Sequence, residues 1–372
     1  MSKVLLGDVA RERRETCKGS KDGYPIVGLE HLTPEEITLS AWDEDKENTF
    51  TKLFRKGDVL FGRRRAYLKK AAVAPFDGIC SGDITVIEAI PEKILPELLP
   101  FIIQNDALFD FAVGKSAGSL SPRVKWEHLR NYSFELPNLE EQRRLAKVLW
   151  AMDATKKAYQ KLIQKTDELV ISQFIALFGE PITNSKGLPL VKLGELGIWK
   201  SGGTPSRSNP AYYTGRINWY SAGELNSMYL SGSVEKITES AVSESSTKIF
   251  KKGSMLVGMY DTAALKMGIL VEDSAANQAC ANIEPYNNIN LVWLYHTLQI
   301  MKDYFLAQRH GCRQKNLSVS MLKNFEIPYA PIGQQEQFVA FSHQRDKSKF
   351  ELEQALAELT ATYKRIIAEN LG

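Results

Sequence analysis

Two long helical stretches constrain the fold of this chain more than any other feature of its sequence. The first runs from residue 138 to 180 after a strand-like segment at 134–137, and the second runs from 332 to 372 after a similar segment at 325–328. At about 1.5 Å per residue, a helix of roughly 40 residues extends about 60 Å, which exceeds the width of a compact domain of this size. Helices of this length need a partner beyond one small domain.

The ends and the hydrophobic spacing of both stretches predict helices. Asn138 and Glu141 have the spacing of a capping box, which Gly333 and Glu336 repeat. With these caps, the second helix is two residues shorter than the first before Asp346, which predicts a slightly different helix offset and an altered spacer. Apolar residues spaced at helical intervals predict a narrow seam on each helix. The predicted seam consists of Leu145, Met152, Tyr159, Leu162 and Leu169 in the first helix and Leu352, Leu356, Leu359, Tyr363 and Ile366 in the second.

Two interpretations account for these seams. Amphipathic helices are common, so each could be a surface helix that packs on its own domain. Their length favours the other interpretation, in which each helix is the partner of the other. This predicts an antiparallel coiled coil with a globular domain at each end.

The first half of the chain recurs in the second half, which indicates an internal duplication. Residues 52–62, with the sequence KLFRKGDVLFG, match residues 248–258, with the sequence KIFKKGSMLVG. The shorter segment 6–9 likewise matches 193–196. The predicted organisation is a first domain, a helix, a second domain and a second helix, at residues 1–137, 138–180, 181–331 and 332–372.

Each domain has a mixed pattern. Short apolar runs at 59–61, 84–87 and 217–220 predict strands, and longer periodic runs at 95–113 and 291–308 predict helices. The predicted fold class is therefore α+β, with two similar domains joined by the paired helices in a pseudo-two-fold arrangement.

The composition is that of an ordinary soluble chain. It has 372 residues, of which 44% are hydrophobic and 24% charged, and it contains no apolar run long enough to span a membrane. The first residues lack a secretory hydrophobic region, so we expect a cytoplasmic location. The cysteines lie far apart without a Cys-x-x-Cys pair, which argues against a zinc site and a disulfide framework. They are Cys17, Cys80, Cys280 and Cys312.

A net charge of +3 is only mildly basic, so a nucleic-acid-binding function has to rest on local clusters of charge. Residues 61–70 contain five cations and two aromatic residues. A solvated surface loop explains such a run as well, and more often than a binding site does when the run stands alone. The candidate DNA contacts in this segment are Arg63, Arg64, Arg65, Tyr67 and Lys69.

A glycine-rich loop at 200–207 gives the second domain a candidate site. Its glycines suit a close approach of the backbone to phosphates, and its hydroxyls and arginine suit contacts to phosphates or bases. An ordinary β-turn explains the loop equally well. The candidate DNA contacts here are Gly202, Gly203, Thr204, Ser206 and Arg207.

Cations also gather shortly before each long helix, at 118–125 and 309–316, and the second of these segments adds amides. Arginine and lysine contact guanine edges or phosphates, and glutamine or asparagine pairs with adenine, so this set of side chains suits the major groove. The candidates are Ser121, Arg123 and Lys125 in the first segment and Arg309, Arg313, Gln314, Lys315 and Asn316 in the second.

In this order, and duplicated, these features resemble the DNA-specificity subunit of type I restriction-modification systems over nearly the full chain. Three elements carry the resemblance. They are the segment 202–207 followed by Tyr212, Tyr213 and 217–219; the element Lys-Gly-Asp-Val-Leu-Phe-Gly at 56–62 with its second-half counterpart; and a Leu-Pro pair at 136–137 followed by Glu141 and Gln142 at the start of a long helix.

The resemblance implies a function in DNA recognition. Each domain would be a target recognition domain that reads one half of a bipartite DNA sequence, and the paired helices would set the gap between the halves. The partners would be double-stranded DNA, two modification subunits that methylate adenine with S-adenosylmethionine, and optionally motor-nuclease subunits that use ATP and Mg. We expect no cofactor, no metal site and no membrane association in this chain.

The chain itself lacks the motifs of a catalytic subunit. Residues 209–212, Asn-Pro-Ala-Tyr, come close to the base-holding motif of adenine methyltransferases but lack its second proline, and no glycine-rich cofactor loop accompanies them. A phosphate-binding Gly-x-x-x-x-Gly-Lys-Ser/Thr loop is also missing. We therefore expect no catalytic residue. A stand-alone DNA-binding protein, or a silent cassette of the same frame without a methyltransferase partner, is the alternative.

Overall fold

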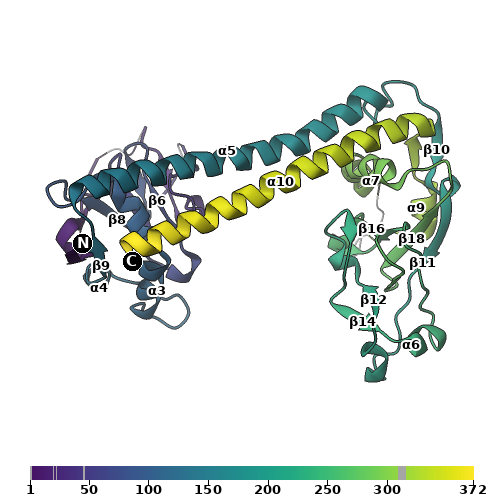
Figure 1. Ribbon diagram of the computed structural model, residues 1–372, viewed down its shortest axis with the longest axis horizontal. Helices are drawn as coiled ribbons and strands as arrows, with labels where there is room; N and C mark the ends of the chain where they lie inside the picture. Colours follow the sequence, from purple (N-terminus) through teal and green to yellow (C-terminus); the bar gives the residue numbers. More distant parts are fainter. Residues whose placement is uncertain (1, 20, 22, 45–46, 309–315) are drawn as a thin grey trace. The chain divides into compact units, whose positions relative to one another are not determined.

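The computed structural model describes residues 2–19, 21, 23–44, 47–308 and 316–372 (Figure 1). The chain divides into two compact units, the first made of Met1–Ile163 with Glu351–Gly372 and the second made of Gln164–Phe350. Each unit contains one mixed α/β domain, the beginning of one long helix and the end of the other.

The first unit is built on a four-stranded antiparallel sheet in the order β2-β8-β5-β6. It also contains a three-stranded sheet, β3-β7-β4, and a two-stranded pair, β1-β9. The strands are β1 (Ser2–Leu5), β2 (Ala10–Glu12), β3 (Ile26–Val27), β4 (Lys52–Phe54), β5 (Val59–Gly62), β6 (Ala71–Val73), β7 (Gly78–Cys80), β8 (Ile84–Ala89) and β9 (Ser133–Leu136). The short helices are α1 (Leu6–Val9), α2 (Leu99–Ile103), α3 (Asp106–Gly114) and α4 (Trp126–Leu129).

The second unit repeats this plan with a five-stranded sheet β11-β18-β15-β16-β13, a three-stranded sheet β14-β12-β17 and a pair β10-β19. The strands are β10 (Leu190–Lys192), β11 (Gly197–Ser201), β12 (Ile217–Tyr220), β13 (Tyr229–Leu230), β14 (Glu235–Ile237), β15 (Met255–Gly258), β16 (Met267–Leu270), β17 (Ala275–Ala276), β18 (Cys280–Pro285) and β19 (Glu326–Pro328). The short helices are α6 (Glu239–Ser243), α7 (Leu291–Ile300), α8 (Lys302–Ala307) and α9 (Val319–Asn324).

The duplication seen in the sequence extends to backbone hydrogen bonds. At the end of β5 the N–H of Gly62 donates to the carbonyl of Lys70 at 2.9 Å, and at the end of β15 the N–H of Gly258 donates to that of Lys266 at 2.8 Å. The predicted strands at 59–61, 84–87 and 217–220 are confirmed as parts of β5, β8 and β12.

The two helices predicted within the domains are wrong as continuous helices. The stretch 95–113 breaks at Asn105, whose side-chain oxygen accepts from the N–H of Ala107 at 3.0 Å and thereby caps α3. The stretch 291–308 breaks at Met301, where ψ is 1°, so that α7 and α8 are separate helices. Apolar periodicity covers both sides of each break, which is why the pattern alone suggested one helix.

The long helices are α5 (Leu139–Phe178) and α10 (Ile332–Leu371), of 40 residues each. The side-chain oxygen of Asn138 accepts from the N–H of Glu141 at 3.0 Å, which confirms this residue as a cap. The other half of the predicted box is replaced, because the carboxylate of Glu141 accepts from Arg144. The cap predicted at Gly333 is wrong, because α10 already begins at Ile332. The carbonyl of Pro331 accepts the hydrogen bonds of its first turn, from the N–H groups of Gln334 and Gln335.

The predicted shortening of the second helix is also wrong. Asp153 and Asp346 both occupy the fifteenth position of their helices, and Gln142 and Gln335 both occupy the fourth. The error came from the misplaced cap, which aligned the two helices two residues out of step.

The buried face of α5 differs from the predicted seam at two positions. Leu162 and Leu169 are 47% and 50% exposed, whereas the next residues, Ile163 and Val170, are partly and fully buried. Intervals of three and four residues continue through Ile163 and Val170, so a helix turns Leu162 and Leu169 about 100° away from that face. The other predicted seam residues are buried or partly buried: Leu145, Met152, Tyr159, Leu352, Leu356, Leu359, Tyr363 and Ile366.

In both units the long helices contribute to the core of the domain. In the first unit, Ile367 and Leu371 of α10 are buried, and the side-chain amide of Asn105 donates to the carbonyl of Leu371 at 3.0 Å. In the second unit, the rings of Phe174 in α5 and Phe338 in α10 lie 5.3 Å apart, edge to face. Burial of these apolar side chains is what holds each helix end to its domain.

Candidate nucleic-acid interface

In the first unit, the structure brings together the two predicted basic segments. The N–H of Arg65 donates to the carbonyl of Pro122 at 2.8 Å, and the N–H of Val124 donates to that of Arg63 at 3.0 Å. Residues 63–69 and 121–125 therefore form one surface, which we call the basic loop pair.

One carboxylate joins the two halves of the basic loop pair. Asp83 accepts from Nε of Arg123 at 2.7 Å and lies 3.5 Å from a guanidinium nitrogen of Arg64. The hydrogen bond from Arg123 is the main reason that the pKa of Asp83 lies below its usual value. Arg64 also donates to the hydroxyl of Ser121. The two guanidinium groups are thus held close together while their side chains stay 40% and 44% exposed.

The other predicted residues of the basic loop pair differ in their solvent exposure and in their ion pairs. Tyr67 is 54% exposed and Arg65 is exposed, so both are accessible to a ligand. Lys69 forms an ion pair with Asp106 at 2.6 Å. Lys125 is exposed and immediately precedes α4.

Lys125 and Arg63 line a hollow of mixed charge. Its other polar residues include Arg14, His128 and Glu12. Nε of Arg63 is buried and has no hydrogen-bond partner among the described residues. The hollow therefore offers both hydrogen-bond donors and acceptors, which is the chemistry that base edges require.

In the second unit, the glycine-rich loop packs against the chain itself. A Cβ atom on Gly202 would lie 2.1 Å from the carbonyl oxygen of Asn277, and one on Gly203 would lie 2.6 Å from that of Ser246. The N–H of Gly203 is also used, because it donates to the carbonyl of Ala276 at 2.9 Å. These glycines are required for contact with neighbouring backbone, so the structure gives a different reason for them than an approach to phosphates.

Arg207 is the most constrained cation of this loop. Its guanidinium group forms two hydrogen bonds to the carboxylate of Glu235, at 2.5 and 2.7 Å, and these hydrogen bonds lower the pKa of Glu235. The guanidinium carbon lies 4.2 Å from the ring centre of Tyr213 and 5.1 Å from that of Trp219. This pairing and stacking hold Arg207 in one orientation while its side chain remains 55% exposed.

The remaining predicted residues of the loop bond to their neighbours. The hydroxyl of Thr204 donates to the side-chain oxygen of Gln278. The hydroxyl groups of Ser206 and Ser208 lie 2.7 Å apart. Ser206 is exposed and Thr204 is half-buried.

The cation-rich segment before α10 is described only at its end. Arg309, Arg313, Gln314 and Lys315 lie outside the described residues. The side-chain oxygen of Asn316 accepts from the N–H of Asp261 at 3.2 Å, so this position lies against the loop that follows β15.

Equivalent positions in the two units carry different side chains. The N–H of Arg63 donates to the carbonyl of Asp83 at 3.0 Å, and the N–H of Met259 donates to that of Ala279 at 2.8 Å. Asp83, which joins two arginines in the first unit, therefore corresponds to an alanine in the second. The two units share these backbone hydrogen bonds, but they differ in the side chains that a ligand would contact.

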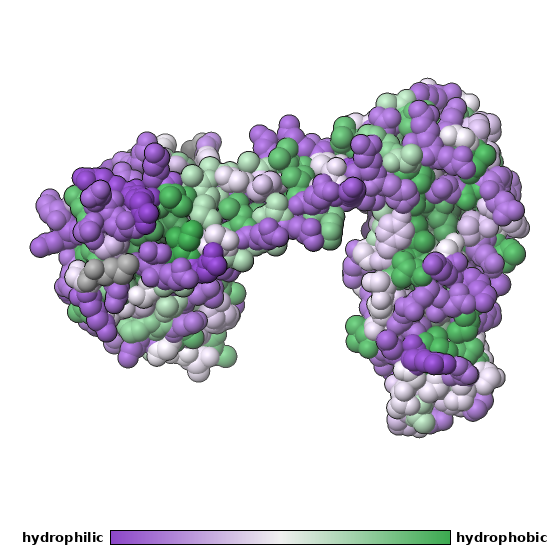
Figure 2. Space-filling view, viewed as in Figure 1, coloured by the Kyte–Doolittle hydropathy of each residue, from purple (hydrophilic) through white to green (hydrophobic). Residues whose placement is uncertain are grey.

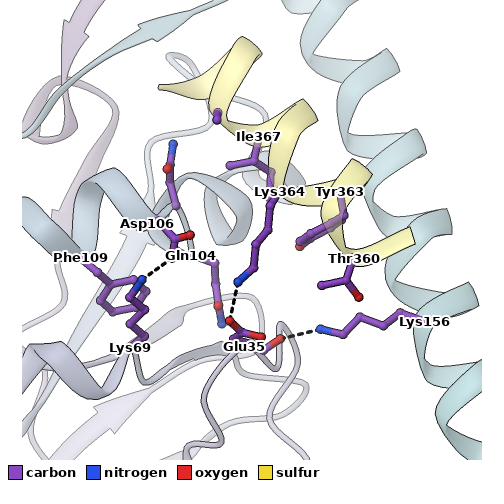
Figure 3. Close-up of a pocket in the computed structure, with 12 residues that line it drawn as sticks. Glu35, Lys69, Gln104, Asp106, Phe109, Lys156, Thr360, Tyr363, Lys364 and Ile367 are labelled. Carbon is purple, nitrogen blue, oxygen red and sulfur yellow. Dashed lines mark hydrogen bonds and ion pairs between the residues drawn. The ribbon is translucent and has the colours of Figure 1, made fainter. Parts of the chain in front are cut away.

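The sequence analysis missed a charged cluster in the first unit. Lys364 of α10 lies 2.6 Å from a carboxylate oxygen of Glu35, and Lys156 of α5 donates to the backbone carbonyl of the same residue at 3.2 Å (Figure 3). Glu35 has a φ of 63°, which is unusual for a residue with a side chain. These residues are far apart in the sequence, so no local signal could have identified the cluster.

One group of possible metal ligands also lies in the first unit. The ligand atoms of Glu30, His31 and Asp43 lie within 4.8 Å of one another. Nδ1 of His31 accepts from the N–H of Gly28 at 3.0 Å, and Nε2 lies 3.6 Å from Asp43. Both ring nitrogens are thus engaged with the protein, and we assign no metal to this group.

Comparison with known proteins identifies the family. The model of the type I restriction modification DNA specificity domain matches this chain twice, at residues 3–168 and 186–360. The chain belongs to this family. Specificity subunits of type I systems are DNA-recognition proteins and not catalytic ones, in agreement with the prediction that this chain is not an enzyme.

Curated specificity subunits match one part of the chain. The specificity subunit of the type I restriction enzyme EcoR124I/EcoR124II from Escherichia coli is 28% identical over 153 residues, which is 40% of this chain and 38% of that protein. The MjaIX specificity subunit from Methanocaldococcus jannaschii is 31% identical over 157 residues, 40% of this chain and 35% of that protein. The chain thus matches less than two-fifths of the length of either relative.

Solved structures of type I systems have the same fold over the whole specificity chain. The S subunit from M. genitalium has a TM-score of 0.61 and 13% identity, and covers 100% of this chain and 96% of its own. A chain from a study of complex assembly and conformational transition of the type I R-M system has a TM-score of 0.61 and 18% identity, with coverages of 99% and 97%.

Among the residues of this protein that the structure describes, no helix is long and apolar enough to cross a membrane.

Proposed function

We propose that this chain is the specificity subunit of a type I restriction-modification complex, in which each domain recognises one half of a bipartite, gapped DNA site. The observation that carries the proposal is the duplicated specificity domain, matched at 3–168 and again at 186–360. We assign the two target recognition domains to residues 1–137 and 181–331. The frame shared by the two domains, together with their different loop side chains, favours two half-sites of different sequence.

The candidate contacts divide into two chemical roles. Exposed cations such as Arg65 and Lys125 neutralise phosphates and fix the position of each domain on the duplex. The paired guanidinium groups of Arg64 and Arg123, held by Asp83, are placed to contact base edges because their orientation is fixed before binding. The proposed interface also includes Arg63, Tyr67, Lys69 and Ser121 in the first domain and Thr204, Ser206, Arg207, Arg309, Arg313, Gln314, Lys315 and Asn316 in the second. Gly202 and Gly203 would shape the loop of the second domain through their packing against neighbouring backbone.

The long helices, at 138–180 and 332–372, are proposed to pair as an antiparallel coiled coil that sets the gap. In the second unit this is supported by Lys349 of α10, which lies 2.8 Å from the carboxylate of Asp167 in α5. Because a helix of about 60 Å spans roughly 18 base pairs at 3.4 Å each, the half-site centres should lie less than roughly 18 base pairs apart.

We further propose that outward-facing positions on the long helices contact two methyltransferase subunits. Apolar side chains that do not face the domains, including Leu162, Leu169 and Ile171, are 47%, 50% and 48% exposed. Both hydrophobic and hydrophilic side chains lie on the visible face of the long helices (Figure 2). The methyltransferase subunits would supply S-adenosylmethionine chemistry, and motor-nuclease subunits that join them would use ATP and Mg, while this chain supplies the recognition.

The test is to map adenine methylation in DNA from cells that carry this chain together with a candidate methyltransferase subunit. Cells with the methyltransferase alone are the control. A new gapped and asymmetric motif that requires this chain is the expected result. If a folded, DNA-binding chain gives no new motif with any methyltransferase encoded near it, the proposal fails, and a stand-alone or silent-cassette protein becomes the better description.

A further inference from the structure

Two buried glutamines join the long helices to the domains in the same way. Gln142 lies in the first turn of α5 and is 4% exposed. Its Oε1 accepts from the backbone N–H of Leu95 at 2.9 Å, and its Nε2 donates to the carbonyl of Pro137 at 2.9 Å. Leu95 immediately precedes the helical turn Pro96–Leu98, so this one amide connects a helix of the domain with the start of the long helix.

Gln335 makes the same connection in the second unit. It is fully buried in the first turn of α10. Its Oε1 accepts from the N–H of Asn290 at 2.8 Å, and its Nε2 donates to the carbonyl of Ala330 at 2.7 Å. Asn290 is the cap of α7, so the acceptor again contacts the residue that begins a domain helix. In both units the carbonyl that receives the donor lies five residues before the glutamine.

Only an amide satisfies both bonds of each connection. The N–H of Leu95 needs an acceptor and the carbonyl of Pro137 needs a donor, and glutamine provides both at the end of a side chain long enough to span them. A glutamate keeps the acceptor but loses the donor. A methionine has a similar length but leaves both backbone groups buried without partners.

The position of this connection makes the far end of the long helix sensitive to small changes at the glutamine. It lies at the point where a helix of 40 residues leaves the domain. A change of about 5° in that angle displaces the far end of a helix of about 60 Å by about 5 Å, which exceeds the 3.4 Å between successive base pairs. A small loosening at the glutamine is therefore enough to change which gap the two domains accept.

We propose that Gln142 and Gln335 are positioning residues, each of which fixes the angle between one recognition domain and its long helix and so restricts the complex to one gap length. This inference rests on the proposed function. The glutamines are buried and would not contact DNA, so their effect would be on the spacing of the half-sites and not on the sequence of either half-site.

The first experiment measures gap preference. The chain, in complex with its methyltransferase, is assayed on duplexes whose half-sites are separated by the native gap or by one base pair more or less. Gln142→Met and Gln335→Met are compared with Gln160→Met, the same substitution at an exposed position of α5. We expect each buried variant to lose about tenfold in its preference for the native gap, the effect of one or two lost buried hydrogen bonds, with the half-site sequences unchanged. Equal loss of methylation at all gaps would instead indicate a purely stabilising role and overturn the inference.

The second experiment does not depend on methylation. Spin labels are attached at Glu92 in the first domain and Ala154 in α5, both exposed and both in the first unit, after Cys17 and Cys312 are replaced by serine. The distance distribution between the labels should broaden or shift in Gln142→Met and stay unchanged in the matched control.

An unchanged distribution in Gln142→Met would overturn the positioning role. If the wild-type chain directs no gapped methylation, the proposed function fails, and with it the effect on gap length. The label distances then still decide whether the glutamine fixes the angle of the helix.

Discussion

Replacing Gly202 by alanine tests why the glycine-rich loop of the second domain contains glycine. An added Cβ would lie 2.1 Å from the carbonyl oxygen of Asn277 and 2.4 Å from that of Ala276. Real contacts of this kind are essentially never shorter than 3.0 Å, so the neighbouring backbone has to move by nearly 1 Å. That movement strains the bonds from Gly203 to Ala276 and from Asn277 to Tyr220, both 2.9 Å long.

The expected cost follows from these contacts. Forcing extra volume into a packed site costs about 1–3 kcal/mol, and each weakened backbone hydrogen bond adds up to about 1 kcal/mol. We therefore expect Gly202→Ala to lower the free energy of unfolding of the second domain by about 3 kcal/mol. For a domain of this size, this corresponds to a fall in melting temperature of about 6–12 °C.

The glycine serves either internal packing or a close approach of the loop to phosphates. Scanning calorimetry of the full chain, together with half-site DNA binding measured well below the melting transition, separates these two explanations. Gly232→Ala is the matched control, because no atom lies within 4 Å of its added Cβ. If the glycine serves internal packing, Gly202→Ala melts early but binds DNA normally while it is folded. A variant that melts like the wild type and yet fails to bind its half-site would refute this reasoning and restore the close approach to phosphates.

Three further predictions concern burial. Because burial lowers the pKa of His296 to about 4, the unfolded chain binds a proton below about pH 6.5 that the folded chain does not. The free energy of unfolding should thus fall by up to about 1.4 kcal/mol for each unit by which the pH is lowered from about 6.5 to about 4. His296→Gln should flatten this slope in denaturant titrations, and an equal slope in the variant and the wild type would contradict the burial of a neutral His296. Leu169→Glu should change the free energy of unfolding by less than about 0.5 kcal/mol because its side chain is half exposed, whereas Val170→Glu should cost about 3 kcal/mol or more; equal melting temperatures would place the buried face elsewhere. Burial raises the pKa of Cys80 and Cys280 to about 12, so a thiol reagent at about pH 8 should modify them only after unfolding, and rapid modification of the native chain would disprove their burial.

The sequence by itself determined the repeated features of this protein. The match between 52–62 and 248–258 predicted an internal duplication, and equivalent backbone hydrogen bonds, from Gly62 to Lys70 and from Gly258 to Lys266, occur in the two units. The length of α5 and α10 also followed from local signals, since apolar periodicity depends only on residues three or four positions apart. Patterns of this kind succeed because the interactions that produce them are local.

Only the tertiary structure decided what the candidate site residues do. The partner of Arg207 is Glu235, 28 positions away, and the backbone that requires Gly202 is Asn277, 75 positions away. Such partners are chosen by strand pairing and by the packing of one loop on another, and neither leaves a trace in the local pattern. The same holds for Gln142, because the N–H that it binds belongs to a segment 47 positions earlier in the chain. Local sequence determines which elements form, whereas the groups left to face a ligand are determined by which side chains the folded chain has already engaged.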